Sequence, residues 1–174
     1  IKPSNEGSSL GLSIIKNFSP DDSKKREELD ISILQCNKVS KNVIIEEYIK
    51  GREITVGILG NKLFPILEIQ PVNKFYDYEC KYTKGKSKYI VPAVNIDIKL
   101  EDNILNTAIK IYELLDCRHY ARVDFRLSEN NDLYLLEVNT LPGFTDTSLF
   151  PMAAKSIGIN YKDLLLKIIK MSKK

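Results

Sequence analysis

Residues 120–140 read YARVDFRLSENNDLYLLEVNT, and this stretch decides the fold. Apolar and charged side chains alternate over residues 120–127, which predicts a strand with one buried face and one polar face. The buried face would carry Ala121, Val123, Phe125 and Leu127, and the polar face Arg122, Asp124 and Arg126. Residues 133–140 predict a second strand, in which Glu137 and Asn139 share a face. The two strands together predict a β-hairpin.

The turn of this hairpin sets which residues face each other. Asn130-Asn131 suits a two-residue turn, because asparagine tolerates the positive φ that such turns need. Counting outward from that turn gives the facing pairs Glu129 with Asp132, Leu127 with Tyr134, Asp124 with Glu137, and Arg122 with Asn139. A slip of one residue would remove this pairing, so the predicted pairing depends on this register.

Asp124 opposite Glu137 places two carboxylates about 5 Å apart at Cβ, where they repel each other. A shared proton, a basic partner or a metal ion would offset this repulsion. With the side-chain carbonyl of Asn139, the two carboxylates form an all-oxygen set that suits Mg²⁺. The alternative is a salt bridge in which Arg122 or Arg126 neutralises the acidic pair, and the hairpin alone leaves both readings open.

The rest of the chain mixes helices and strands without regular alternation, which is typical of an α+β fold. We expect a helix from Ser19, as its N-cap, to Cys36, and three further helices at residues 101–115, 149–156 and 161–171. The first helix would bury Leu29, Ile33 and Leu34, and the second would bury Ile104, Leu105, Ala108, Ile111, Tyr112 and Leu115. Strands are expected at residues 43–49, 53–59 and 62–69, with a polar, irregular loop at about 73–92.

Composition bounds the class of protein. The 174 residues suffice for one medium domain or two small ones, and the net charge of +3 is too weak to indicate nucleic acid. The three cysteines, Cys36, Cys80 and Cys117, are far apart and form no CxxC pair, which favours a reducing compartment. No apolar run approaches membrane-spanning length. Because the chain starts at Ile1 and not at a methionine, we expect a cut inside a longer protein.

Residues 2–11, KPSNEGSSLG, combine a cation, two glycines and three serines. Glycine lets the backbone approach an anion closely, and lysine and serine add charge and donors, so the stretch predicts a phosphate-binding loop. It matches neither the Walker pattern nor the GxGxxG dinucleotide pattern. The alternative is an ordinary surface turn.

Five segments, in this order, resemble the D-alanine–D-alanine ligases of the ATP-grasp superfamily: residues 2–11, 46–53 (EEYIKGRE), 75–82 (FYDYECKY), 122–124 (RVD) and 137–143 (EVNTLPG). The resemblance runs from Lys2 to the final helix. It implies an ATP-grasp fold with antiparallel or mixed sheets flanked by helices. Residues 1–50 would be the remainder of the central domain, with the phosphate loop, a helix and the adenine-binding strand. Residues 51–174 would be the C-terminal catalytic domain, with a lid at about 73–92.

The resemblance also implies roles for individual residues. ATP would be contacted by Lys2, Ser8, Ser9 and Lys81 at the phosphates, by Glu46, Tyr48 and the backbone of Ile49 at the adenine, and by Glu53 at the ribose. Asp124, Glu137 and Asn139 would bind two Mg²⁺ ions, with Mn²⁺ as a substitute. Arg122 and the amide of Gly143 would stabilise an oxyanion, and Ser148 and the amide of Leu149 would hold the carboxylate of the second D-alanine. Tyr82 would contact that D-alanine and reach Ser8.

The implied reaction is ATP-dependent ligation of two D-alanines through an acyl phosphate, for peptidoglycan synthesis in the bacterial cytoplasm. The pair Lys81-Tyr82 favours an amine nucleophile, because the resistance ligases that use D-lactate or D-serine depart from it. The family's first ATP-contacting lysine and its N-terminal domain are absent, so we expect this fragment to be inactive alone. The full-length protein would be a homodimer, with no nucleic-acid or membrane partner.

Two other readings of the sequence stay open at this stage. One is another ATP-grasp carboxylate–amine ligase, and the other is a non-catalytic domain that binds nucleotide or a partner. A nucleic-acid-binding module could use residues 81–88 with the tyrosines before them, but the acidic hairpin opposes it. The single histidine, His119, has no partner at a telling spacing, and we expect it to pack or to lie on the surface.

Overall fold

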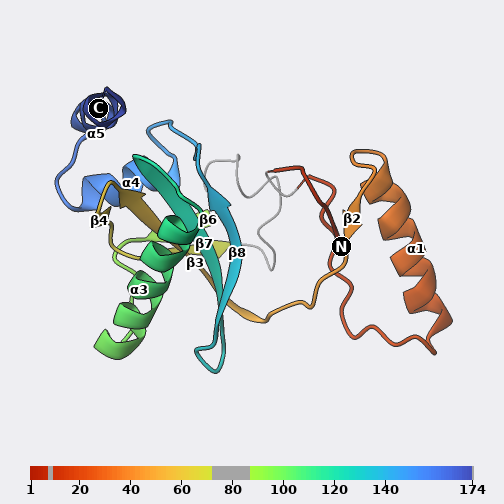
Figure 1. The fold of residues 1–174 in the computed structure, drawn as a ribbon. Coiled ribbons are helices and arrows are strands. Elements are labelled where there is room, and N and C mark those ends of the chain that lie inside the picture. Colours follow the sequence, from red (N-terminus) through yellow and green to blue (C-terminus); the bar gives the residue numbers. More distant parts are fainter. Residues whose placement is uncertain (8–9, 72–86, 174) are drawn as a thin grey trace. The chain divides into compact units, whose positions relative to one another are not determined.

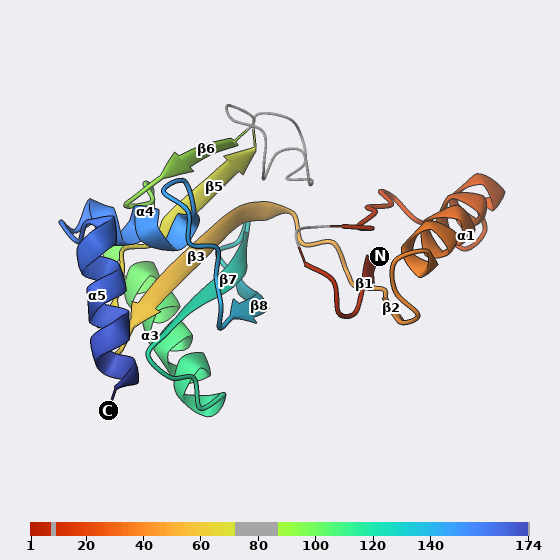
Figure 2. The same ribbon diagram turned by 90° about the horizontal axis from the view of Figure 1, so that it is seen from above.

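The computed structural model describes residues 1–7, 10–71 and 87–173. The chain divides into two compact units, Ile1–Tyr48 with Pro71–Ser87 and Ile49–Gln70 with Lys88–Lys174, and each is described by itself (Figures 1 and 2). Ser8, Ser9, Lys81 and Tyr82, to which the sequence assigned roles, lie outside the described residues. So does most of the predicted loop at 73–92.

The first unit pairs β1 (Lys2–Pro3) with β2 (Val43–Ile44) in antiparallel fashion and adds helix α1 (Ser23–Asn37). The predicted N-cap, Ser19, is wrong. Asp22 caps α1, because its carboxylate accepts hydrogen bonds from the amides of Lys24 and Lys25. Ser19 lies in the turn before the helix, where its hydroxyl accepts from the amide of Asp21 at 3.4 Å.

Two further predictions for the first unit are corrected. The strand expected over residues 43–49 ends at Ile44, where its short pairing with β1 ends. Leu34, expected to be buried, has 64% of its surface exposed, because the buried side of α1 is marked by Ser32 and Cys36, one turn apart.

The second unit is built on one sheet in the order β6-β5-β3-β7-β8, with β4 paired to β3. Its strands are β3 (Gly51–Leu59), β4 (Lys62–Leu63), β5 (Leu67–Pro71), β6 (Ser87–Ile90), β7 (Tyr120–Ser128) and β8 (Leu133–Asn139). The central strand β3 runs antiparallel to both β5 and β7. The expected strand over residues 62–69 is two strands, since Pro65 cannot donate a ladder hydrogen bond. Strand β6 lies inside the segment expected to be a loop.

The helices of this unit are α3 (Ile98–Leu114), α4 (Leu149–Ser156) and α5 (Tyr161–Ser172). Helix α3 starts before the predicted residue 101, because Asp97 accepts from the amide of Leu100 at 2.8 Å and caps it. Leu115 follows the helix and is 59% exposed, contrary to its predicted burial. None of the helices in the described part of the chain is long and apolar enough to span a membrane.

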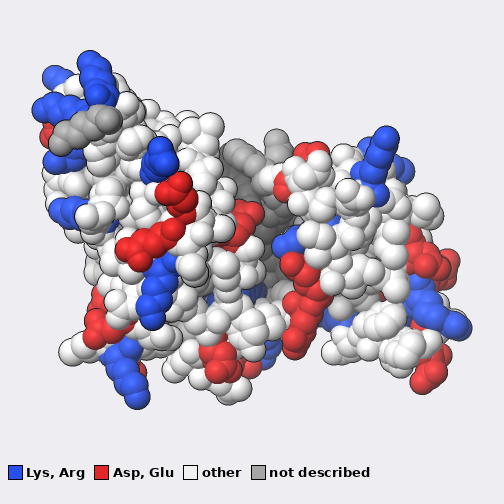
Figure 3. Space-filling model, viewed as in Figure 1, with Lys and Arg blue, Asp and Glu red and all other residues white. Residues whose placement is uncertain are grey.

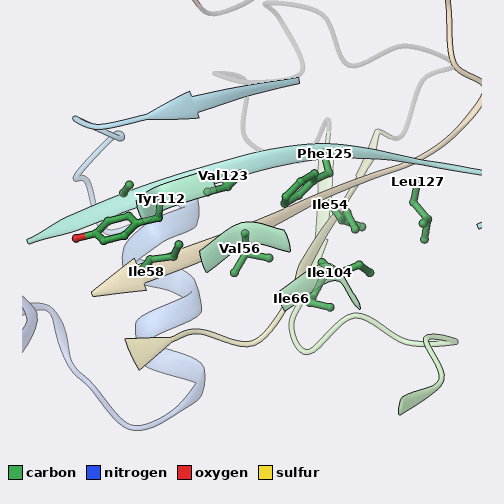
Figure 4. Packing of buried hydrophobic residues seen from close by; sticks show 11 residues of the cluster. Ile54, Val56, Ile58, Ile66, Ile104, Tyr112, Val123, Phe125 and Leu127 are labelled. Atoms are coloured by element: carbon green, nitrogen blue, oxygen red, sulfur yellow. The ribbon is translucent and has the colours of Figure 1, made fainter. Parts of the chain in front are cut away.

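The core forms where α3 packs on one face of the sheet (Figure 4). From the helix come Ile104, Ala108 and Tyr112, spaced four apart. From β3 and β7 come Ile54, Val56, Ile58, Ala121, Val123, Phe125 and Leu127, which confirms the predicted buried face of β7. Because strand side chains alternate, Thr55 of β3 and Asp124 of β7 lie on the opposite face. That opposite face carries the candidate site.

The hairpin register confirms the two pairings that matter for the site, Asp124 with Glu137 and Arg122 with Asn139. The pairing of Leu127 with Tyr134 is wrong, since Leu127 pairs with Leu133. The expected pairing of Glu129 with Asp132 is wrong too, because the amide of Ser128 donates to the carbonyl of Asp132.

The cause is a longer turn than the two residues predicted. The amide of Asn131 donates to the carbonyl of Ser128, and Asn131 alone of the asparagine pair has a positive φ, of 65°. A bulge then shifts the register between Asp124 and Phe125, with Leu136 as the extra residue on β8. The shift at the turn and the shift at the bulge cancel.

A partly buried ion pair lies on the α3 side of the sheet, between Arg52 of β3 and Glu68 of β5. The Nε and Nη2 atoms of Arg52 donate to the two oxygens of Glu68 at 3.1 and 2.6 Å. The same guanidinium donates to the carbonyls of Val94 and Asn95, ahead of α3. Burial would raise the pKa of Glu68, but hydrogen bonds from Arg52 and Gln70 and the charge of Arg52 outweigh burial and lower it.

This pair predicts a dependence of stability on pH. Because the pKa of Glu68 is lowered by folding, its contribution is present above the ordinary glutamate value of about 4.3 and is lost as the pH falls through the lowered pKa. Glu68→Gln should therefore lower the urea midpoint at neutral pH, and its difference from the wild type should shrink between about pH 6 and about pH 3. The control is Glu129→Gln, at an exposed glutamate of the hairpin turn. A constant difference across this range would contradict the assignment.

Candidate active site

Asp124 lies at the centre of the polar face, and the residue is only 8% exposed. It accepts four hydrogen bonds. Oδ1 accepts from Thr55 Oγ1 at 2.6 Å and from Arg122 Nε at 2.8 Å. Oδ2 accepts from Arg122 Nη2 at 2.7 Å and from Asn139 Nδ2 at 2.9 Å. Donors from three strands, β3, β7 and β8, thus fix this carboxylate in the sheet.

Asn139 joins the two acidic side chains. Its Nδ2 donates to Asp124 Oδ2 and also to Glu137 Oε1, the latter at 3.1 Å. Glu137 itself is exposed. The structure therefore brings all three predicted ion ligands together on one face of β7 and β8.

Both arginines of β7 bind acceptors, but only one of them lies on the acidic pair. Arg122 holds Asp124 through a bidentate ion pair in which the two side chains are 15% and 11% exposed. Arg126 binds elsewhere, since its Nε donates to the carbonyl of Ile49 at 2.9 Å and its Nη1 to Glu53 at 3.4 Å. The basic partner foreseen for the acidic pair is thus Arg122 and not Arg126.

The donor set fits a hard divalent cation. It consists of two carboxylates and one amide side chain, and no cluster of three or more His, Cys, Asp or Glu side chains that could hold a metal occurs in the described part of the chain. Mg²⁺ takes one or two carboxylates and fills its octahedron with water and phosphate oxygens, so such a sparse set suits it. Soft or borderline metals would call for sulfur or imidazole ligands.

The loop after β8 brings together two more of the predicted residues. The hydroxyl of Ser148 accepts from the amide of Thr145 at 2.9 Å. A Cβ added to Gly143 would lie 3.0 Å from that hydroxyl, so the backbone of Gly143 and the side chain of Ser148 are neighbours. Ser148 precedes α4, and its side chain makes no capping hydrogen bond to that helix. Leu149 is the first residue of α4, where backbone amides are unsatisfied by the helix.

In the first unit, Lys2 and Glu46 form an ion pair of 2.8 Å, with side chains 30% and 51% exposed. The sequence assigned Lys2 to phosphate and Glu46 to adenine, and the structure pairs the two side chains with each other. Tyr48, at the end of this unit, is 41% exposed. Such exposed pairs contribute little to stability, so both side chains remain available to a ligand.

One residue of the site was missed by sequence reasoning. Thr55 is 2% exposed and lies directly opposite Asp124 in the β3–β7 ladder. Its hydroxyl also donates to the carbonyl of Val123 at 3.2 Å, in addition to the short contact with Asp124. The available signal was a single polar residue in the otherwise apolar run of residues 54–59, ITVGIL.

Acidic and basic side chains are interspersed over the face shown in Figure 3, with lysines gathered over α5. The helix α5 contributes Lys162, Lys167 and Lys170, but it also carries Asp163. The basic stretch at residues 81–88 lies almost wholly outside the described residues.

The chain has the ATP-grasp fold, which it shares with its structural neighbours. Helices pack on its antiparallel sheet, and the polar face of that sheet presents two carboxylates, an amide and an arginine. The chain belongs to the family described as the C-terminus of D-ala D-ala ligase, whose model matches residues 1–170. This confirms the resemblance stated from the sequence and the α+β fold class.

Individual relatives agree with this family. The D-alanine--D-alanine ligase of Methylacidiphilum infernorum is 42% identical over 99% of this chain, which spans 54% of that protein. The structure of the D-alanine--D-alanine ligase from Bacillus anthracis complexed with ATP matches 85% of this chain and 46% of its own, with 33% identity and a TM-score of 0.70. The VanG D-Ala:D-Ser ligase of Enterococcus faecalis matches 83% and 43%, with 36% identity and a TM-score of 0.71. The chain thus spans about half the length of the relatives it matches.

Thr55 provides a test of how the carboxylate is held. Thr55→Val keeps the shape of the side chain but removes the donor to a buried, charged acceptor, which should cost about 1.5–3 kcal/mol of unfolding free energy. Thr55→Ser keeps the hydroxyl and should lose less than half of that amount, from the missing methyl group. Urea unfolding of both variants measures the difference. Equal losses in the two variants would show that the hydroxyl is not what matters.

Proposed function

We propose that this chain is the C-terminal catalytic part of a D-alanine–D-alanine ligase, which joins two D-alanines at the expense of ATP. The carboxylate of the first D-alanine attacks the γ-phosphorus of ATP and gives an acyl phosphate and ADP. The amine of the second D-alanine then attacks the acyl carbon, and phosphate leaves. The observation that carries the proposal is the convergence of Asp124, Glu137, Asn139 and Arg122 on one sheet face in a member of this family.

We assign Asp124, Glu137 and Asn139 to two Mg²⁺ ions, for which Mn²⁺ can substitute. When bound, these ions neutralise charge on the phosphates. The protein's part is to hold the ligands still. Thr55 and the β3–β7 ladder fix Asp124, and the β7–β8 register places Glu137 opposite it.

The nucleotide contacts are assigned within each unit. In the first unit, we assign Lys2, Ser8, Ser9 and Lys81 to the phosphates, and Glu46 and Tyr48 to the adenine. In the second unit, we assign the amide of Ile49 to the edge of the adenine ring. The hydrogen bond from Arg126 to the carbonyl of Ile49 holds this part of the backbone in place. Glu53 is assigned to the ribose hydroxyls. Its position beside Arg126 fixes the direction of its carboxylate.

The acyl-transfer step uses the face beside the ion ligands. We assign Arg122 and the amide of Gly143 to the oxyanion of the tetrahedral intermediate. The hydroxyl of Ser148 and the amide of Leu149 receive the carboxylate of the second D-alanine, at a helix N-terminus whose dipole favours an anion. Tyr82 contacts the incoming amino acid and reaches Ser8. Proximity of these groups supports the proposal, because the backbone of Gly143 lies beside Ser148.

The remaining assignments concern the whole protein. We propose that residues 1–50 complete a central domain and residues 51–174 form the catalytic domain, with a lid at about 73–92. A further domain supplies the glutamate that orients the first D-alanine. The full-length protein is proposed to be a homodimer in the bacterial cytoplasm that serves peptidoglycan synthesis.

One alternative has a specific observation in its favour. The D-Ala:D-Ser ligase of Enterococcus faecalis matches this chain about as well as the ligase from Bacillus anthracis does. Fold and identity therefore leave the second amino acid open. The choice rests on Lys81-Tyr82, and a substrate assay decides it.

The test measures phosphate release by the full-length protein with ATP, Mg²⁺ and one D-amino acid at a time. D-Alanine should support turnover, and D-serine or D-lactate should support much less. Asp124→Asn should lower kcat by roughly 10²–10³-fold, because it removes a carboxylate that holds the ions. The control is Glu129→Gln, at an exposed glutamate in the turn of the same hairpin. Glu129 pairs only with Lys50 among the ion pairs of the described residues, and its replacement should keep the rate. Full activity in Asp124→Asn, or equal rates with D-alanine and D-serine, would refute the assignment.

A further inference from the structure

The carboxylate of Asp124 has no acceptor position left for an ion. A carboxylate offers about four lone-pair positions, two on each oxygen. Oδ1 accepts from Thr55 and Arg122, and Oδ2 accepts from Arg122 and Asn139, all at 2.6–2.9 Å. A cation can therefore bind Asp124 only if one of these donors leaves.

The orientation of Asn139 leads to the same conclusion. Its amide presents Nδ2, a donor, to both Asp124 and Glu137. A metal ion between these carboxylates would require the amide oxygen instead, because an amide nitrogen that carries two protons is not a ligand. The amide must turn over about χ2, which is a broad torsion with roughly two-fold preferences. In the structure, the amide of Asn139 bridges the two carboxylates.

Turning the amide of Asn139 removes one donor, from Oδ2 of Asp124. Of the donors that remain on Asp124, Arg122 is the one that can leave. Thr55 is 2% exposed and also binds the backbone of β7, so its hydroxyl is fixed. Arg122 is 15% exposed and extends from the same strand as Asp124, two residues away. It is also the only one of the donors that carries a positive charge, so a divalent cation replaces its electrostatic role as well as its position.

We propose that Arg122 and Asn139 substitute for the cation when none is bound, and that entry of the ion displaces the guanidinium from Asp124 and turns the amide of Asn139. Displacement makes the guanidinium available to the oxyanion of the acyl-transfer step. The inference rests on the proposed function, since it takes the ion site and the role of Arg122 from it. It adds that loading the ion and freeing Arg122 are one event.

The proposal predicts that removal of Arg122 tightens metal binding, because the ion no longer competes with a bidentate, charged partner. Arg122→Met should lower the Kd for Mn²⁺, measured without nucleotide in the full chain by the electron paramagnetic resonance of free Mn²⁺. The expected gain is roughly tenfold, as a charge-assisted bidentate pair is lost. The matched control is Arg126→Met, which removes the same charge from the same strand but leaves Asp124 paired. A gain no larger than that of Arg126→Met would overturn the proposal.

Arg122→Lys separates displacement from simple charge and guards against misfolding of the first variant. Lysine keeps the charge but lacks the bidentate fork, so Mn²⁺ affinity should still rise, by a smaller factor. Affinity equal to the wild type would count against the proposal. Asp124→Asn distinguishes the two levels of inference. If it leaves Mn²⁺ binding unchanged, the ion site of the proposed function fails; if it abolishes binding while the Arg122 variants match their control, only the present inference fails.

A spectroscopic measurement follows the guanidinium itself. The Nε–H resonance of Arg122 should shift or broaden on addition of Mg²⁺, as its hydrogen bond to Asp124 is lost. Arg52 provides an internal control, because it holds Glu68 by the same bidentate contact away from Glu137 and Asn139. Its Nε–H resonance should stay in place. If Mg²⁺ binds and neither resonance moves, Arg122 is not displaced.

Discussion

The polar face of the second unit depends on holding one carboxylate, that of Asp124, inside a sheet. Taking a charge out of water costs several kcal/mol unless hydrogen bonds and an opposite charge offset the loss. The fold meets this need with three neighbouring strands, since Thr55 of β3 and Asn139 of β8 donate from either side, and Arg122 of β7 supplies the charge. The polar face of the sheet is thus as closely specified as the apolar face that packs on α3.

The two faces of the sheet have different roles. On one face, α3 covers aliphatic side chains of β3 and β7 and gives the unit its stability. On the other face, Phe150 of α4 and Phe64 pack over Gly57, where a Cβ would lie only 2.6 Å from Phe64. This aromatic packing fixes α4 on the same face of the sheet as Asp124, and so it holds Ser148 and Leu149 in place. Stability and the site are therefore linked through the alternation of one strand, β3.

The sequence was sufficient for the α+β class, the alternation of β7 and the pairing of Asp124 with Glu137, because period-two patterns leave few options. It was insufficient for the turn, whose conformation depends on which asparagine adopts positive φ, a choice that nearby backbone contacts make. Thr55 was missed because its partner lies 69 positions away in the chain. The caps at Asp22 and Asp97 show the same limit, since several side chains near a helix start could serve and geometry selects one.

The bulge at Leu136 separates the pairing of the ion ligands from the length of the hairpin turn. Given the turn that the structure has, a regular ladder would set Leu136 opposite Asp124 and send Glu137 to the other side. The extra residue restores the register, so that Glu137 pairs with Asp124 and Asn139 pairs with Arg122. A two-residue turn without a bulge would give the same two pairs, Asp124 with Glu137 and Arg122 with Asn139, so the spacing of the acidic positions and the amide does not require one particular loop length.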